Sequence, residues 1–60
     1  MEPLHPRLTE ILDLARQRGR VEVEWLASQF EVTPQTIRKD LNDLCDRQLL
    51  QRIHGGAVYP

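Results

Sequence analysis

Hydrophobic residues recur at helical spacing in three stretches of the chain, with polar residues between them. The first stretch predicts a helix over residues 6–18, with Pro6 in its first turn and Gly19 at its end. The second predicts a helix over residues 23–30, with Trp25 on the side opposite its hydrophobic stripe. The residues assigned to the inner faces of these two helices are Leu8, Ile11, Leu12, Ala15, Val23, Leu26, Ala27 and Phe30.

The third helix has the clearest beginning in the chain. Thr33 is a favourable N-cap and Pro34 suits the first helical position, so we expect a helix over residues 33–47. A short turn over residues 31–33 separates it from the second helix. Its apolar face comprises Ile37, Leu41, Leu44 and Cys45, and its polar face comprises Gln35, Lys39, Asn42 and Asp46.

The C-terminal residues predict a small hairpin. A strand is expected over residues 49–53, a turn at His54-Gly55-Gly56 and a return strand over residues 57–59. Residues 20–22 are expected to form only a short extended link between the first two helices. The predicted fold is therefore mainly α with a small β-hairpin. Three helices followed by a C-terminal wing are the plan of a winged helix-turn-helix domain over residues 1–60.

Size and composition exclude several classes of protein. Sixty residues form one domain with one small core. The single cysteine, Cys45, allows neither an internal disulfide nor a cysteine-based zinc site, and we expect no metal or cofactor. No apolar run is long enough to span a membrane, and the N-terminal segment with Glu2 and Pro3 lacks the apolar core of a signal peptide. A cytoplasmic protein is the natural interpretation.

Catalytic function is not expected of this chain. The sequence offers no nucleophile with an adjacent base, no glycine-rich loop of the kind that holds phosphates, and too little volume for a substrate pocket. Charge gives less guidance, because the formal net charge is -1 whereas DNA-binding domains are usually basic. The acidic excess lies in residues 1–32, and a small basic excess lies in residues 33–60.

The junction of the second and third helices carries the functional inference. Two helices separated by a turn of about three residues, the second of them capped and amphipathic, can place that second helix in the major groove of DNA. Glutamine pairs bidentately with adenine, and arginine or lysine with guanine, while hydroxyls and free N–H groups at a helix start suit a phosphate. The candidate DNA-binding residues at this helix start are Thr33, Gln35, Thr36, Arg38 and Lys39.

The hairpin supplies a second candidate contact. Arg52 and His54 flank the Gly55-Gly56 tip, so the wing can lie against a phosphate or over the minor groove. The alternative is that the two glycines simply close a hairpin. His54 is not expected to bind a metal, because the only other histidine, His5, lies far away in the sequence.

Three further residues are expected to be structural. Asp40 is expected to orient a cation or to cap a neighbouring helix, and Cys45 to pack as a small apolar residue. Trp25 has two open interpretations. It either marks a contact with a partner protein or domain, or it folds back over the first helix.

The sequence from Thr33 to Leu41 (TPQTIRKDL), followed by Leu44 and an R-x-H-G-G segment at Arg52–Gly56, resembles the DeoR-type helix-turn-helix signature. Arg7, Ile11 and Ala15 of the first helix and Val23, Leu26 and Ala27 of the second fit the same pattern. Within that family the third helix and the HGG wing look most similar to glycerol-3-phosphate-type repressors. The resemblance covers essentially all sixty residues.

The resemblance implies the N-terminal reading head of a bacterial transcriptional repressor. It implies double-stranded operator DNA as the partner, a homo-oligomer in the full-length protein, and a larger C-terminal domain, absent from this chain, that binds a sugar-phosphate effector. It places Gln35, Thr36, Arg38 and Lys39 on the recognition helix and residues 52–56 in the wing. A different class stays open, namely a winged helix used for protein–protein contact, for which the near-neutral charge and Trp25 are the support.

Three positions depart from the usual pattern of the family. Gln48 stands where a glycine commonly follows the third helix, Glu22 stands where serine or threonine caps the second, and Trp25 replaces a residue that is usually charged. None lies on the expected reading face, so we expect them to affect stability or packing rather than DNA binding.

Overall fold

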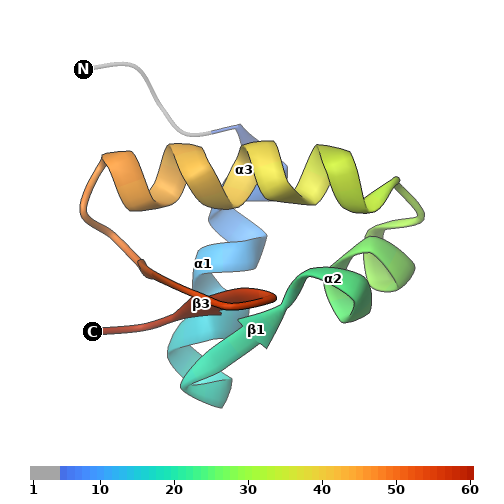
Figure 1. The fold of residues 1–60 in the computed structure, drawn as a ribbon. Coiled ribbons are helices and arrows are strands. Elements are labelled where there is room, and N and C mark those ends of the chain that lie inside the picture. Colours follow the sequence, from blue (N-terminus) through green and yellow to red (C-terminus); the bar gives the residue numbers. More distant parts are fainter. Residues whose placement is uncertain (1–4) are drawn as a thin grey trace.

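The computed structural model describes residues 5–60, so the prediction about the N-terminal segment, which rests on Glu2 and Pro3, lies outside the described residues. Three helices and a small sheet follow one another along the chain (Figure 1). Their bounds are α1 Pro6–Arg18, β1 Arg20–Glu22, α2 Val23–Phe30, α3 Pro34–Asp46, β2 Gln51–Ile53 and β3 Gly56–Val58. The predicted fold class is confirmed, and the first two helices have the expected bounds.

The helix ends follow from local chemistry. Gly19 closes α1 with φ 86°, a left-handed backbone that glycine adopts without strain. At its start, the Nδ1 atom of His5 accepts a hydrogen bond from the backbone N–H of Arg7, a cap that the sequence did not predict. Glu22 precedes α2 without a side-chain hydrogen bond to its backbone. That helix therefore begins without the serine or threonine cap that is usual in the family.

The sheet is larger than predicted. It has three strands in the order β1-β3-β2, and both pairs are antiparallel. Residues 20–22 are extended as expected, but they form a paired strand as well as a link, which was not predicted: Val21 pairs with Ala57, and both residues are fully buried. The first expected hairpin strand was too long, and the second is displaced by one residue, because Gly56 begins β3 instead of belonging to the turn.

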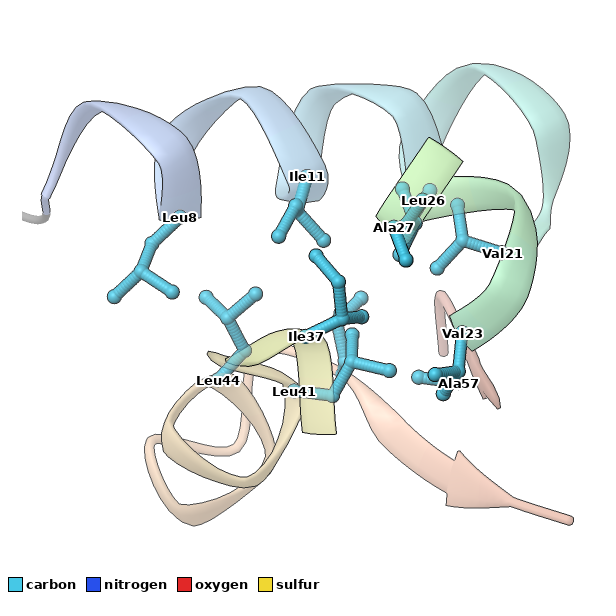
Figure 2. Packing of buried hydrophobic residues seen from close by; sticks show 12 residues of the cluster. Leu8, Ile11, Val21, Val23, Leu26, Ala27, Ile37, Leu41, Leu44 and Ala57 are labelled. Atoms are coloured by element: carbon cyan, nitrogen blue, oxygen red, sulfur yellow. The ribbon is translucent and has the colours of Figure 1, made fainter. Parts of the chain in front are cut away.

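The core lies between the three helices and the inner face of the sheet. Figure 2 shows Ile11 of α1 directed toward Ile37, Leu41 and Leu44 of α3. Val21 of β1 is buried in the same cluster. Leu12 and Phe30, which were assigned to the inner faces, are only half-buried at the edge of this cluster. The shared core fixes α3 against the rest of the domain and leaves its opposite face to solvent.

Two residues other than glycine adopt a left-handed backbone where helices end. Glu31 has φ 54° after α2, and Gln48 has φ 62° after α3. Such a conformation costs a side chain with a Cβ about 1–2 kcal/mol. The prediction that Gln48 closes α3 less comfortably than a glycine would is therefore confirmed.

Candidate nucleic-acid interface

The start of α3 is capped as the sequence predicted. The Thr33 hydroxyl accepts a hydrogen bond from the backbone N–H of Thr36 at 3.2 Å, and Pro34 opens the helix. The Thr33 and Thr36 hydroxyl oxygens lie 3.0 Å apart and share a further hydrogen bond. Thr33 is exposed and Thr36 is half-buried, so the start of the helix faces solvent. The Thr33 hydroxyl is used as the acceptor of the capping hydrogen bond.

The candidate side chains of α3 are brought together on one exposed surface. Gln35, Arg38 and Lys39 are all exposed, and they lie across the helix from the buried Ile37 and Leu41. Figure 1 places α2 below the end of α3 at which these residues lie. The two helices are joined by residues 31–33 and contact each other, as in a helix-turn-helix.

Asp40 fixes α3 to the start of α1. The Arg7 guanidinium donates two hydrogen bonds to the Asp40 carboxylate, from Nε at 2.5 Å and from a terminal nitrogen at 3.2 Å. The Asp40 side chain is 12% exposed and that of Arg7 is 28% exposed. This hydrogen bond raises the pKa of the Arg7 guanidinium, although burial opposes the effect. The expectation that Asp40 orients a cation is confirmed, and the cation comes from the first helix, a contact that sequence spacing alone could not reveal.

The wing is held close to the helix-turn-helix unit. The Gly55 carbonyl at the hairpin tip accepts a hydrogen bond from the backbone N–H of Val23, the first residue of α2, at 2.8 Å. Gly56 lies so close to β1 that an added Cβ would be 2.1 Å from the Val21 carbonyl oxygen. His54 and Gly55 are exposed at the tip. The wing is therefore a fixed neighbour of the two helices.

Arg52 lies on β2, the strand of the wing that packs beside α3. Arg52 is the cross-strand partner of Ala57 on the adjacent strand β3, and β2 packs against α3. Burial raises the pKa of the Cys45 thiol on α3, and the positive charge of Arg52 opposes that rise. Arg52 is exposed while Cys45 is half-buried against the core, as predicted for Cys45. The wing thus carries its exposed cation on a strand next to α3.

The cations of the described residues divide into two groups. Ion pairs engage Arg7, Arg16, Arg20 and Arg47, and the Arg18 guanidinium stacks on Trp25. Between residues 5 and 60 no ion pair involves Arg38, Lys39 or Arg52. Among the described residues, the three cations engaged neither in an ion pair nor on an aromatic ring are thus all candidate DNA-binding residues, and their charge is available to an external anion.

Trp25 does not stand free on the surface. The Arg18 guanidinium carbon lies 4.1 Å from the centre of the indole ring, and the indole is half-buried against the core. Of the two interpretations, the structure supports packing against the first helix, since Arg18 is the last residue of α1. This removes the exposed indole, which was one of the two supports of the protein-interaction alternative.

No group of three or more histidine, cysteine, aspartate or glutamate side chains between residues 5 and 60 could hold a metal ion. In the same part of the chain, no helix has the length and apolar character needed to cross a bilayer.

A helix-turn-helix pair that leaves the polar start of its second helix exposed, followed by a wing carrying a cation, defines a winged helix-turn-helix domain of the kind that binds DNA. The chain belongs to the DeoR-like helix-turn-helix family, whose model matches residues 7–60. No solved structure matches it.

Curated relatives agree with this assignment. The glycerol-3-phosphate regulon repressor of Escherichia coli (strain K12) is 50% identical over 50 residues, covering 83% of this chain and 20% of that protein. The protein of the same name from Haemophilus influenzae is 44% identical over 54 residues, covering 90% of this chain and 21% of that protein. The L-fucose operon activator of Haemophilus influenzae is 46% identical over 48 residues, covering 80% of this chain and 19% of that protein. These relatives are named as transcriptional regulators, and the chain spans about a fifth of their length.

Proposed function

We propose that this chain is the operator-reading domain of a bacterial transcriptional regulator of sugar or polyol phosphate metabolism. One observation carries the proposal: the three cations that make neither an ion pair nor a cation–π contact among the described residues all belong to the predicted reading surface formed by α3 and the wing. A DNA-binding surface needs charge that is free to replace counterions on phosphates. The names of the relatives support the metabolic assignment.

The residues of α3 divide into two roles. Gln35, Arg38 and Lys39 are exposed near the start of the helix, where side chains reach base edges in the major groove. Gln35 suits adenine, and the two cations suit guanine. Thr33 and Thr36 lie at the capped helix start, where backbone N–H groups and hydroxyls suit a phosphate. The phosphate contacts position the helix, and the base contacts select the sequence.

The wing contacts the DNA beside the helix. Arg52 supplies charge, and His54 with Gly55 forms the exposed tip. Because the Gly55 carbonyl is hydrogen-bonded to the start of α2, the wing and α3 meet the DNA as one rigid surface. No movement of the wing is needed for binding.

The whole regulator is expected to be a homo-oligomer that works in the cytoplasm. A single winged domain buries only about 600–1,000 Å² on DNA, so paired heads on half-sites about one helical turn apart are needed for tight binding. The relatives extend well beyond the matched region, and we place the sugar-phosphate effector site in such an additional domain. Whether the regulator represses or activates stays open, since its relatives include both kinds.

The test is DNA binding by this chain, measured by fluorescence anisotropy with duplexes selected from a random-sequence pool. Three free cations predict a slope of about −2.7 in log K against log salt, which weakens binding about 40-fold between 50 and 200 mM salt. Arg38→Ala should weaken binding to the selected duplex by about 5- to 150-fold. Arg16→Ala removes the same charge from the exposed surface of α1 and should change binding little.

The outcomes separate the proposal from the alternative. Salt-dependent binding that Arg38→Ala impairs and Arg16→Ala does not would support a reading surface on α3. A folded chain that binds no duplex at low salt would refute DNA reading and bring the protein-interaction interpretation forward. Equal losses in the two variants would show a diffuse charge effect instead of a defined surface.

A further inference from the structure

The exposed face of α3 extends beyond the residues assigned above. Gln35, Lys39, Asn42 and Asp46 follow one another at intervals of four, three and four residues, so they lie along one stripe of the helix. All four are exposed, and the stripe lies opposite the buried residues of the core. A helix that places Gln35 and Lys39 in the major groove therefore turns Asn42 toward the same groove.

The side chain of Asn42 has no structural role in the domain. It makes no hydrogen bond to any other residue between 5 and 60, whereas its neighbour Asp43 accepts one from Arg47 at 2.8 Å. Asparagine is also a weaker helix former than alanine in the middle of a helix, because its side chain competes for backbone hydrogen bonds. Both polar atoms of the Asn42 carboxamide, the donor Nδ2 and the acceptor Oδ1, are thus available to a ligand.

Asparagine has a defined partner in the major groove. Its carboxamide donates to N7 and accepts from the N6 amino group of adenine in a bidentate pair, and no other base presents that pattern. From Gln35 to Asn42 the helix rises about 10 Å, or about three base-pair steps of the duplex. The two amides of the stripe are therefore spaced to contact different base pairs of one half-site.

The charge along the stripe becomes negative after Asn42. Asp46, the next residue along it and the last of α3, takes part in no ion pair within the described part of the chain. Its negative charge opposes close approach of that end of the helix to phosphates. Base contact by α3 is thus confined to the stretch from Gln35 to Asn42, which makes Asn42 the last reading residue of the helix.

We propose that Asn42 is a further specificity-determining residue of this domain, which selects an adenine about three base-pair steps from the base pair contacted by Gln35. The proposal rests on the proposed function, because it requires α3 to enter the major groove. It adds Asn42 to the reading surface. It also limits the stretch of DNA sequence that one domain contacts, because no residue of α3 beyond Asn42 reaches a base.

The experiment compares base preferences position by position. The wild-type chain, Asn42→Ala, Gln35→Ala and a control variant are each used to select duplexes from a random-sequence pool, and affinities are then measured by fluorescence anisotropy. The control is Gln17→Ala, which removes an exposed amide from the last turn of α1. Far-UV circular dichroism confirms that each variant is folded, and the alanine at position 42 should leave α3 intact.

The expected result is a loss of preference at a single position. Asn42→Ala should lose the adenine there and bind the wild-type site about 5- to 100-fold more weakly, while its affinity for unrelated duplexes and its salt slope stay unchanged. The lost position should differ from the one that Gln35→Ala loses. The Gln17→Ala variant should select the wild-type site.

Other results would overturn the proposal in distinguishable ways. If the wild type selects a site and Asn42→Ala selects the same one, Asn42 reads no base although the proposed function stands. If Asn42→Ala weakens binding equally for every duplex, its contact is with the backbone. If the wild type binds no duplex, the proposed function and this inference both fail.

Discussion

Replacing Gly56 with alanine tests whether the three-stranded sheet holds the domain together. An ideal Cβ on Gly56 would lie 2.1 Å from the Val21 carbonyl oxygen and 3.1 Å from both the Val21 carbonyl carbon and Glu22 Cα. All three are backbone atoms, so no flexible side chain can move aside. Reaching an ordinary contact of 3.4 Å from the oxygen would move β1 away from β3 by about 1.3 Å, the difference between 3.4 and 2.1 Å. A shift of that size breaks the hydrogen bonds between the two strands.

The expected loss is large for a domain of this size. Breaking two or three backbone hydrogen bonds at about 1 kcal/mol each gives a destabilisation of about 3 kcal/mol, before any exposure of Val21 is counted. Sixty residues at about 0.05–0.15 kcal/mol each give a total free energy of unfolding of roughly 3–9 kcal/mol. The Gly56→Ala variant should therefore lose between a third and all of its stability, and part of its population should be unfolded at room temperature.

Urea unfolding measures this loss, followed by circular dichroism and by the fluorescence of Trp25, the single tryptophan. The matched control is Gly55→Ala at the adjacent position. Gly55 has φ 78° and no atom within 4 Å of an added Cβ, so alanine there adds only left-handed strain of about 1 kcal/mol. If the two variants differ by less than about 0.5 kcal/mol, the close contact between β3 and β1 does not hold the fold and the reasoning is wrong.

Three further changes should have smaller effects. Asp40→Asn should destabilise the domain by about 1–2 kcal/mol in thermal unfolding, because it weakens a largely buried ion pair, and a double-mutant cycle with Arg7→Gln should show coupling between the two residues. Gln48→Gly should raise the stability by up to about 1 kcal/mol, since φ 62° suits glycine, and an unchanged or lower melting temperature would contradict this. Burial raises the pKa of Cys45 above its ordinary value of 9.0, so iodoacetamide should alkylate the folded chain more slowly than the urea-unfolded chain. The thiol ionises at a lower pH in the unfolded chain than in the folded chain. The stability that Cys45 contributes is therefore complete below pH 9.0 and is lost as the pH rises through the pKa of the folded thiol.

The helices were predictable from the sequence because their signals are local. Thr33 and Pro34 cap and open α3 through contacts within a few residues, and Gly19 ends α1 in the same way. The third strand was missed for the opposite reason. Residues 20–22 pair with residues 56–58, and no pattern within three residues reveals a partner so distant in the chain.

The same distinction applies to the candidate site. Gln35, Arg38 and Lys39 could be placed on an exposed helix face because helical periodicity determines which residues share a face. That Asp40 pairs with Arg7, and so is not a negative charge available to repel DNA, required the packing of α1 against α3. Neighbours in the sequence are visible in the pattern, whereas neighbours across the core are not.

The near-neutral charge, which argued against DNA binding, has a physical explanation in the pairing of charges. Most acids and most arginines of the described residues lie in the first two helices or in local ion pairs, where they offset each other. What a phosphate meets at the surface of α3 and the wing is the charge of Arg38, Lys39 and Arg52. Three cations give weak binding to DNA of any sequence, because each contributes one released counterion. Weak non-specific binding suits a DNA-binding domain that acts in an oligomer. The base contacts then determine which sequence the oligomer binds, and the number of domains determines its affinity.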